Sequence, residues 1–400
     1  MRVTASSRSL TPESARAWAR KNLFSSLFNS LLTVLAVVFI FLVARGLLRW
    51  IFFTADWEPV TSYLKLYFTG QYPAEHLWRV GSIVWMVSFL MGLTWGRLGG
   101  AAAIFAKVMA IALGLAGLLP VGLDRMSLEL RLWFLANPAL IMTGFWVGRN
   151  VLKQARWVAI GWLASLPLAA LLMRGVGSDG ALARVDSNLW GGLLLTFTLA
   201  FVGIIASFPL GILLALGRRS SLPLVKVLCT TFIEVVRGVP LVTILFMASI
   251  LLPLFLPEQI RVDRVVRAMI GMTLFSAAYM AENVRGGLAA IPPGQYEAAR
   301  AVGLSGFLTM SLIVLPQALR LVIPAIVGQF IALFMDTTLA VIVGLLELLA
   351  VGKSIVQSNP EYISHQAEVY LFVALVFWVF TFSMSYASRR LETALGVGKR

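Results

Sequence analysis

The chain has 400 residues, of which 59% are hydrophobic and only 13% are charged. Soluble domains carry roughly 25% charged residues, so this composition excludes an ordinary soluble globular protein. The mean hydropathy is +0.88. Several apolar runs also reach the length of about 20 residues that a membrane-spanning helix needs. The sequence therefore predicts an all-α polytopic membrane protein.

The net charge of +15 does not indicate a nucleic-acid partner. The basic residues collect between apolar runs and at the two ends of the chain, as the positive-inside rule expects, and basic loops suit a surface of anionic lipid. His76 and His365 are far apart in the sequence and have no cysteine or acidic cluster beside them. No metal site is therefore expected.

Residues 1–187 are predicted to form an amino-terminal membrane region with about five spans. These spans are expected at residues 27–48, 80–95, 101–121, 132–148 and 157–173. The fourth and fifth are the weakest, and the fourth contains the pair Asn137 and Pro138. Two Gly-x-x-x-Gly patterns, at 92–96 and 144–148, match the spacing of close helix-packing contacts.

Residues 188–400 are predicted to form a second membrane region, again with about five spans. They are expected at residues 189–216, 223–255, 268–290, 321–349 and 368–387, with a polar outer loop at 350–367. Two of these spans should be broken, one near Gly238 and Pro240 and one near Asp336. An even number of spans places both termini in the cytoplasm. We predict about ten spans in total, with about eight as the alternative if residues 132–173 lie differently.

A polar stretch at residues 280–316 interrupts this apolar sequence. Pro292 and Pro293 end any helix that arrives from upstream, and Pro293 also suits the first turn of a new one. Residues 295–302 are good helix formers, and Gly303 is a natural C-terminal stop. The predicted helix has about two to three turns, which is too short to span a bilayer. We therefore expect it in a cytoplasmic loop, with small alanine side chains that a groove of another protein could accept.

The same stretch carries a family pattern. Glu297, Ala298 and Ala299 are followed by Gly303, and the sequence Ile-Val-Leu-Pro ends the stretch at residues 313–316. This spacing resembles the EAA motif of permease subunits of ABC importers, without gap or substitution. The resemblance implies that the short helix docks into a cleft of a cytoplasmic ATPase. Glu297, Ala298, Ala299 and Gly303 would then couple the motion of the ATPase to the permease. The structural alternative is an amphipathic connector between two membrane helices.

Two further runs narrow the resemblance to permeases for polar amino acids. Residues 234–240, which include Glu234 and Arg237, are similar to the Glu-x-x-Arg-Gly-x-Pro run of that family. Residues 209–219 and 226–239 resemble one of the two permease subunits of general L-amino-acid import systems, the M-type subunit. The resemblance covers about residues 189–390, and the amino-terminal extension is longer than this resemblance leads us to expect.

Glu234 and Arg237 are spaced to pair on one face of a helix. A structural ion pair at a helix break and a gate or substrate path are both compatible with this spacing. Asp336, Thr337 and Thr338 resemble the family's Lys-Asp-Thr-Ser-Leu segment, although Met335 replaces the basic residue. Asp336 is expected either to cap the helix that begins at Thr337 or to line the substrate path.

The resemblance implies a bacterial inner-membrane complex in which this chain is not itself an enzyme. Its expected partners are two ATPase subunits, a second related permease subunit and an external substrate-binding protein, with an amino acid as substrate. ATP and Mg²⁺ would bind to the ATPase subunits, because Glu347 stands where a phosphate-binding loop ending at residues 352–354 needs glycine. No cofactor is expected in this chain.

Two other classes of protein were weighed. An ion-driven secondary amino-acid transporter would show inverted repeats and an intramembrane acid at an ion site, and it would leave the short polar helix unexplained. A membrane enzyme acting on lipid-linked substrates would need His, Asp or Glu side chains converging in one cleft. The sequence supplies no convincing repeat and no such constellation.

Overall fold

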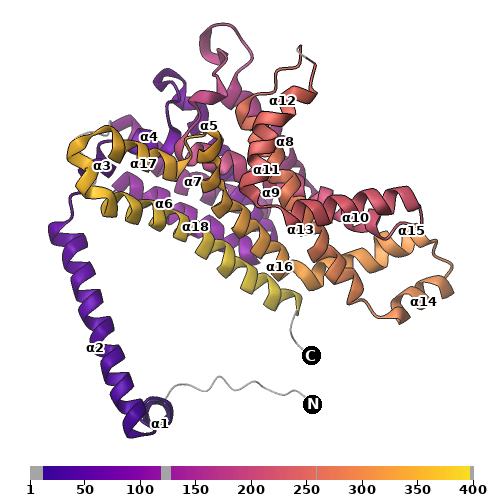
Figure 1. The fold of residues 1–400 in the computed structure, drawn as a ribbon, viewed down its shortest axis with the longest axis horizontal. Helices are drawn as coiled ribbons and strands as arrows, with labels where there is room; N and C mark the ends of the chain where they lie inside the picture. The colour runs from indigo at the N-terminus through magenta and orange to yellow at the C-terminus, as the bar shows by residue number, and fades with distance from the viewer. Residues whose placement is uncertain (1–11, 119–127, 258, 397–400) are drawn as a thin grey trace. The chain divides into compact units, whose positions relative to one another are not determined.

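The computed structural model describes residues 12–118, 128–257 and 259–396. Within these ranges the chain is helical, and its extended pairing is limited to isolated bridges such as Gly70 with Trp190. The chain divides into two compact units, Met1–Trp57 and Glu58–Arg400. The prediction of an all-α protein is confirmed for the described residues (Figure 1).

The first unit consists of α1 (Pro12–Asn22), α2 (Leu27–Arg49) and the π-helical turn η1 (Trp50–Thr54). Ser26 begins α2, because its hydroxyl accepts a hydrogen bond of 3.1 Å from the backbone N–H of Asn29. No side chain of α2 is buried within the unit. Together α2 and η1 form one apolar helix long enough to cross a membrane.

The second unit begins with short helices and four long ones. The short ones are α3 (Glu58–Thr61), α4 (Leu64–Thr69) and η2 (Ala74–His76). The long ones are α5 (Leu77–Leu98), α6 (Gly100–Leu118), α7 (Leu128–Asn150) and α8 (Arg156–Arg174). Two further turns, η3 (Gly180–Leu182) and η4 (Ser187–Leu189), lead to the rest of the unit. The buried Arg79 of α5 donates hydrogen bonds to the carbonyls of Ala181 and Ala183, which fixes the loop that follows α8.

A seam of glycines joins α5 to α7. A Cβ added at Gly92 or Gly96 would collide with a carbonyl of α7, and one added at Gly144 or Gly148 would collide with a carbonyl of α5. The two Gly-x-x-x-Gly patterns therefore pack against each other, as predicted, and let the two backbones approach closely. Ser88 and Asn137 hydrogen-bond across the same pair of helices at 2.8 Å.

Helix α13 (Arg264–Ala289) is at the centre of a second set of helices. The first group is α9 (Gly192–Arg218), α10 (Pro223–Gly238), α11 (Leu241–Phe246), η5 (Met247–Leu251) and α12 (Leu252–Phe255). The second is α14 (Pro293–Ala301), α15 (Gly306–Leu308), η6 (Thr309–Val314), α16 (Leu315–Asp336) and η7 (Thr337–Val343). The chain closes with α17 (Leu348–Ser358), η8 (Pro360–His365) and α18 (Gln366–Leu395). Helix α13 packs against α9, α10, α11 and α16, and its buried face is rich in alanine and glycine.

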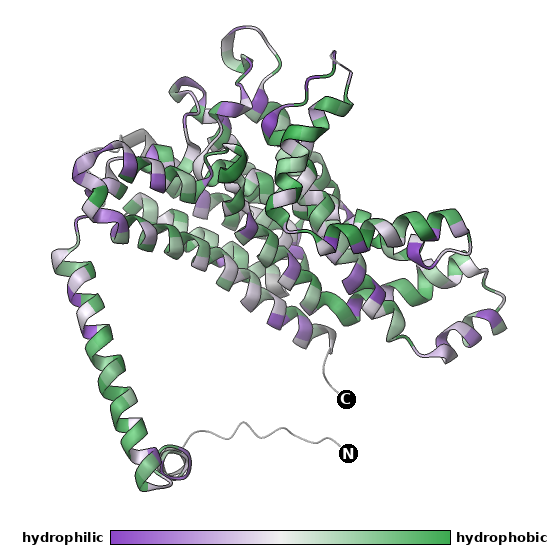
Figure 2. Ribbon diagram, viewed as in Figure 1, coloured by the Kyte–Doolittle hydropathy of each residue, from purple (hydrophilic) through white to green (hydrophobic). Residues whose placement is uncertain are grey.

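Six helices of the described residues are long and apolar enough to cross a membrane, or seven if α10 and α11–α12 form one broken span. The bend between those two pieces is 111°. The predicted break near Gly238 and Pro240 is therefore confirmed, but it is much sharper than the kink of one outward span that we expected. Apolar residues dominate these helices in Figure 2.

The second predicted break is wrong, because α16 continues at Asp336 directly into the 3₁₀ helix η7, and Gly306–Val343 form one continuous span. The polar outer loop predicted for 350–367 is wrong for its first half. Most of α17 lies there, and Val351, Ile355 and Val356 are buried. Its apolar residues were overlooked because α17 is too short to register as a span.

Candidate functional site

Helix α14 fulfils the prediction for the short helix between two membrane spans. Pro293 lies in its first turn, where a missing N–H costs nothing. Gln317 of α16 donates a side-chain hydrogen bond of 3.0 Å to Gln295, which ties α14 to the next long helix. Figure 1 shows α14 at one end of the second unit, in the connection that runs from α13 through α15 to α16.

The end of α14 has the geometry that glycine provides. Gly303 has φ of 79°, in the left-handed region. Its N–H donates to the Arg300 carbonyl at 2.9 Å, and the N–H of Leu304 donates to the Ala299 carbonyl at 3.0 Å. This pair of bonds is a Schellman motif, which satisfies two carbonyls at the helix end. Gly303 thus sets the direction in which the chain leaves α14.

The exposed face of α14 differs in one respect from the expectation. Glu297 and Ala298 are exposed, but Ala299 is only 4% exposed and lies against the chain itself. The predicted surface of adjacent alanines is therefore wrong for Ala299, because that position faces the neighbouring helices. Two large side chains that sequence reasoning missed, Val302 and Phe307, are 75% and 79% exposed beside it.

The Ile-Val-Leu-Pro end of the motif coincides with a π-helical turn. The N–H of Leu315 donates to the Met310 carbonyl, five residues earlier, at the end of η6. Pro316 follows in the first turn of α16 and has no N–H to donate. A local widening of the helix accommodates such a proline. The motif therefore places a helical irregularity directly after α14.

A cluster of five charged side chains lies where α9, α10 and α13 meet. Glu282 of α13 is its centre, with Arg285 Nε at 2.8 Å from one carboxylate oxygen. The other oxygen is 3.6 Å from a guanidinium nitrogen of Arg218 and 3.6 Å from one of Arg237. Glu234 completes the cluster at 2.8 Å from Arg218. Glu282 and Arg285 lie one helical turn apart on α13 and form an ion pair.

The predicted pairing of Glu234 with Arg237 within α10 is wrong. Each side chain instead pairs with another helix, Glu234 with Arg218 of α9 and Arg237 with Glu282 of α13. The Arg237 guanidinium also lies 5.5 Å from the centre of the Tyr279 ring. Helical spacing allows a local pair but cannot exclude a partner on a neighbouring helix. The four side chains therefore link three helices, close to the break that follows Gly238.

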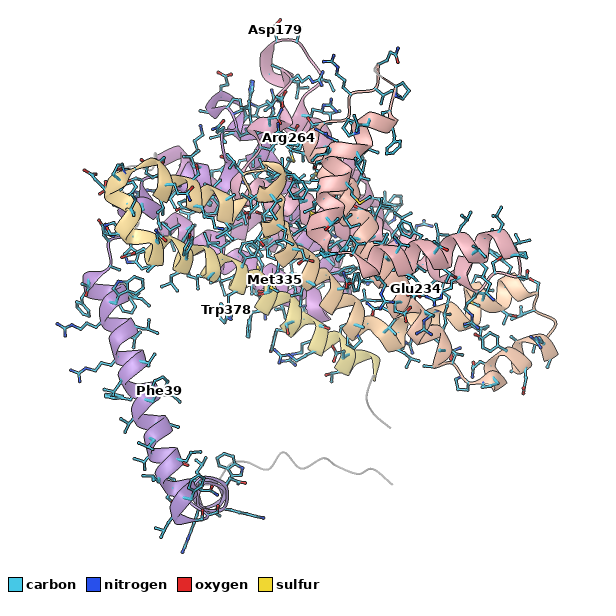
Figure 3. All side chains as sticks on the ribbon, viewed as in Figure 1. Phe39, Asp179, Glu234, Arg264, Met335 and Trp378 are labelled. Atoms are coloured by element: carbon cyan, nitrogen blue, oxygen red, sulfur yellow. The ribbon has the colours of Figure 1, made fainter. Side chains whose placement is uncertain are left out.

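Asp336, Thr337 and Thr338 lie at the junction of α16 and η7. Both hydroxyls donate back to carbonyls of α16, Thr337 to Phe334 at 2.7 Å and Thr338 to Met335 at 2.9 Å. The predicted capping role of Asp336 is wrong, because its side chain accepts no hydrogen bond from η7. Figure 3 labels Met335 at this junction and Glu234 on α10.

Comparison with known proteins identifies the class of molecule that carries these features. Residues 207–397 match the family profile described as "Binding-protein-dependent transport system inner membrane component". The "Inner membrane amino-acid ABC transporter permease protein YhdY" of Escherichia coli (strain K12) is 37% identical, with 96% of this chain and 94% of that protein covered. The "Glutamate/glutamine/aspartate/asparagine transport system permease protein BztC" of Rhodobacter capsulatus is also 37% identical, covering 94% of this chain and 93% of that protein.

A shorter relative and a solved structure cover only the second half of the chain. The "Probable glutamine ABC transporter permease protein GlnP" of Bacillus subtilis is 38% identical over 51% of this chain. The solved structure, "Crystal structure of an amino acid ABC transporter with histidines", is 28% identical with a TM-score of 0.45, covering 51% of this chain and 92% of that one.

The chain belongs to this family of binding-protein-dependent inner-membrane components, as an amino-acid ABC importer permease with a long amino-terminal region. It is a multi-pass inner-membrane protein and the non-catalytic transmembrane component of its system. Family membership implies an external binding protein and an ATPase as partners.

Proposed function

We propose that this chain forms half of the translocation path of an importer for polar or general L-amino acids. Two ATPase subunits, which bind ATP and Mg²⁺, and a second related permease subunit complete the membrane complex. An external binding protein delivers the amino acid. The exposed α14 carries the proposal, since it is a polar helix too short to cross a bilayer and held between two long apolar ones.

In this mechanism α14 transmits the motion of the ATPases. Glu297 and Ala298 are exposed for contact with a cleft of the ATPase, while Ala299 and the Gln295–Gln317 bond fix α14 to its own chain. Movement of α14 would pass through η6 to α16, and through α13 to the charged cluster. We propose Glu234 and Arg237 as part of an inner gate, and Asp336, Thr337 and Thr338 as residues lining the path. Among the described residues Asp336 has no ion-pair partner, which supports a place beside water or substrate.

We further propose about ten crossings, with both termini in the cytoplasm. Helices α2, α5, α6, α7 and α8 would supply the amino-terminal extension, residues 1–187. The transport core, residues 188–400, would use α9, the broken pair of α10 with α11–α12, α13, α16 and α18. Reporter fusions in the loops after α6 and after α8 test this arrangement. It predicts that both loops lie outside the cytoplasm.

Uptake of labelled amino acids tests the function. Bacteria that express the complete system should accumulate labelled L-glutamine or L-glutamate only when this chain is present. ATP depletion should abolish the uptake. Collapse of the ion gradient with ATP maintained should leave it intact, whereas an ion-driven transporter would stop under that treatment. The ATPase should also co-purify with this chain.

The Glu297→Lys variant tests the role of α14. It should insert into the membrane normally but lower uptake by roughly tenfold or more, because it reverses the charge of the side chain that we propose to contact the ATPase cleft. Glu361→Lys is the matched control, since Glu361 is also exposed but lies in η8. Normal uptake by Glu297→Lys would contradict the assignment of α14 to coupling.

A further inference from the structure

A cavity of about 260 Å³ lies at the end of α13 opposite the one that leads into α14. Three segments form its walls: the α11–η5 helix, the first turn of α13 and the end of η7. The lining residues are Phe246, Ser249, Ile250, Arg264, Arg267, Ile342 and Val343. Figure 3 labels Arg264 at this end of the helices, away from Glu234. Apart from the serine and two arginines, the walls are apolar.

Arg264 and Arg267 are one helical turn apart and reach the same cavity. Arg264 is exposed, and its Nη1 makes one long hydrogen bond of 3.4 Å to the Gly344 carbonyl. Arg267 is half-buried and donates from Nη1 to the Ser249 carbonyl, while its buried Nε has no hydrogen-bond partner. Each guanidinium therefore keeps donors for a further ligand.

The two arginines have no counter-charge within the described residues. No acidic side chain of the described part of the chain forms an ion pair with either of them. The adjacent Asp263 is occupied elsewhere, because one of its oxygens accepts from the N–H of Val265 at 2.8 Å and the other from the Ser187 hydroxyl. Two unpaired guanidinium groups beside apolar walls favour an anionic ligand.

The position of the cavity connects it to the parts of the core that can move. Its walls include η5, which lies in the helix after the 111° bend, and η7, where α16 changes from α-helix to 3₁₀ helix. On the proposed topology this end of α13 faces outward. Two arginines at the outer end of a span run against the positive-inside rule, so a functional reason for them is expected.

We propose that Arg264 and Arg267 form a receiving site for the α-carboxylate of the amino acid released by the external binding protein. The inference rests on the proposed function. The planar guanidinium matches a carboxylate through two parallel hydrogen bonds, and the apolar walls can contact the rest of a small ligand. A cavity of this size admits a free amino acid but not a folded protein. A ligand bound there would contact η5 and η7 as well as α13.

Direct binding tests the site. The complete membrane complex, without the binding protein, is placed in nanodiscs of uncharged phosphatidylcholine and dialysed to equilibrium against labelled L-glutamine or L-glutamate. Arg264→Gln should raise Kd roughly tenfold, because it removes a charge-assisted hydrogen-bond pair. Arg264→Lys, which keeps the charge but loses the fork, should have an intermediate effect. L-Glutaminamide, which lacks the α-carboxylate, should not displace the label.

Arg261 provides the matched control. It lines the neighbouring cavity of about 330 Å³, not the one described above, and it is exposed like Arg264. Arg261→Gln should leave Kd within about twofold of the wild type. Arg267 is a less suitable position, since its bond to Ser249 also supports the local packing.

Several outcomes would overturn the inference. An unchanged Kd in Arg264→Gln, or displacement of the label by L-glutaminamide, would exclude carboxylate binding there. If Arg264→Gln raised only the concentration of loaded binding protein needed to stimulate ATP hydrolysis, the arginines would be a docking surface. If the label bound less tightly as phosphatidylglycerol was added, the headgroup of an anionic lipid would be the ligand. A wild-type complex that transports neither amino acid in proteoliposomes would instead refute the proposed function.

Discussion

Arg218 at the end of α9 and Glu234 in α10 form an ion pair, with 2.8 Å between a guanidinium nitrogen and a carboxylate oxygen. The Glu234 side chain is 54% exposed, so solvent screens most of this attraction. Glu282 is only 24% exposed and lies within 4.0 Å of three guanidinium groups. The two acids therefore contribute unequally to the same cluster.

Replacing Glu282 should destabilise the protein more than replacing Glu234. Glu282→Gln leaves Arg218, Arg237 and Arg285 without their common partner, which we expect to cost about 1 to 3 kcal/mol. Glu234→Gln should cost less than about 1 kcal/mol. Thermal unfolding of the two purified variants, measured by tryptophan fluorescence, compares them. Equal losses would show that the cluster is not centred on Glu282.

The end of α14 should depend on glycine at one position only. Gly303→Ala forces a side chain into the left-handed region, at a cost of about 1 to 2 kcal/mol, although nothing lies within 4 Å of the added Cβ. Gly294→Ala, in the first turn of the same helix, also enters open space and has no such strain. Uptake per ATP hydrolysed should fall in Gly303→Ala and stay normal in Gly294→Ala. A loss in Gly294→Ala with normal uptake in Gly303→Ala would show that coupling does not depend on the backbone conformation of Gly303.

The seam between α5 and α7 should tolerate no side chain. Gly92→Ala places a methyl group against the Ile141 carbonyl, and we expect a loss of about 1 to 3 kcal/mol in stability. Gly328→Ala is the control, because a Cβ at Gly328 in α16 meets nothing within 4 Å. The melting temperatures of both variants in detergent provide the measurement. A normal melting temperature for Gly92→Ala would mean that the two helices do not pack through this glycine.

Glu347 should make stability depend on pH. It follows the span that ends at Val343, is fully buried, and accepts hydrogen bonds of 2.8 and 2.9 Å from the N–H groups of Ala350 and Leu349. Burial nevertheless raises the pKa of Glu347 to about 7, against the lowering effect of those bonds and of Lys353. Between about pH 4.5 and pH 7, Glu347 therefore keeps its proton in the folded protein, whereas in the unfolded chain it has lost that proton, because its ordinary pKa is 4.5.

Stability should therefore fall as the pH rises from about 4.5 to about 7, by roughly 3 kcal/mol at most, and then level off. Glu347→Gln removes the titrating group, so its stability relative to the wild type should improve between pH 5 and pH 8. Glu361→Gln, at an exposed acid, should leave that slope unchanged. A difference between Glu347→Gln and wild type that is constant with pH would show that Glu347 does not titrate in this range.

Local signals in the sequence were sufficient for α14 and for the break after Gly238. Pro293 and Gly303 constrain the backbone on their own, and the Gly-Val-Pro run after Arg237 favours the end of a helix. The partner of Glu234 and the burial of Ala299 depend on which helices lie alongside. The cavity at Arg264 also requires η7, about 80 residues further along the chain, which a reading of local patterns cannot place.

The glycine seam has a consequence for biogenesis. The chain enters the bilayer in order, so α6 is inserted before α7 exists to meet α5. The α5–α7 pair must therefore close as a post-insertion event, with α5 waiting in lipid until two later segments have been made.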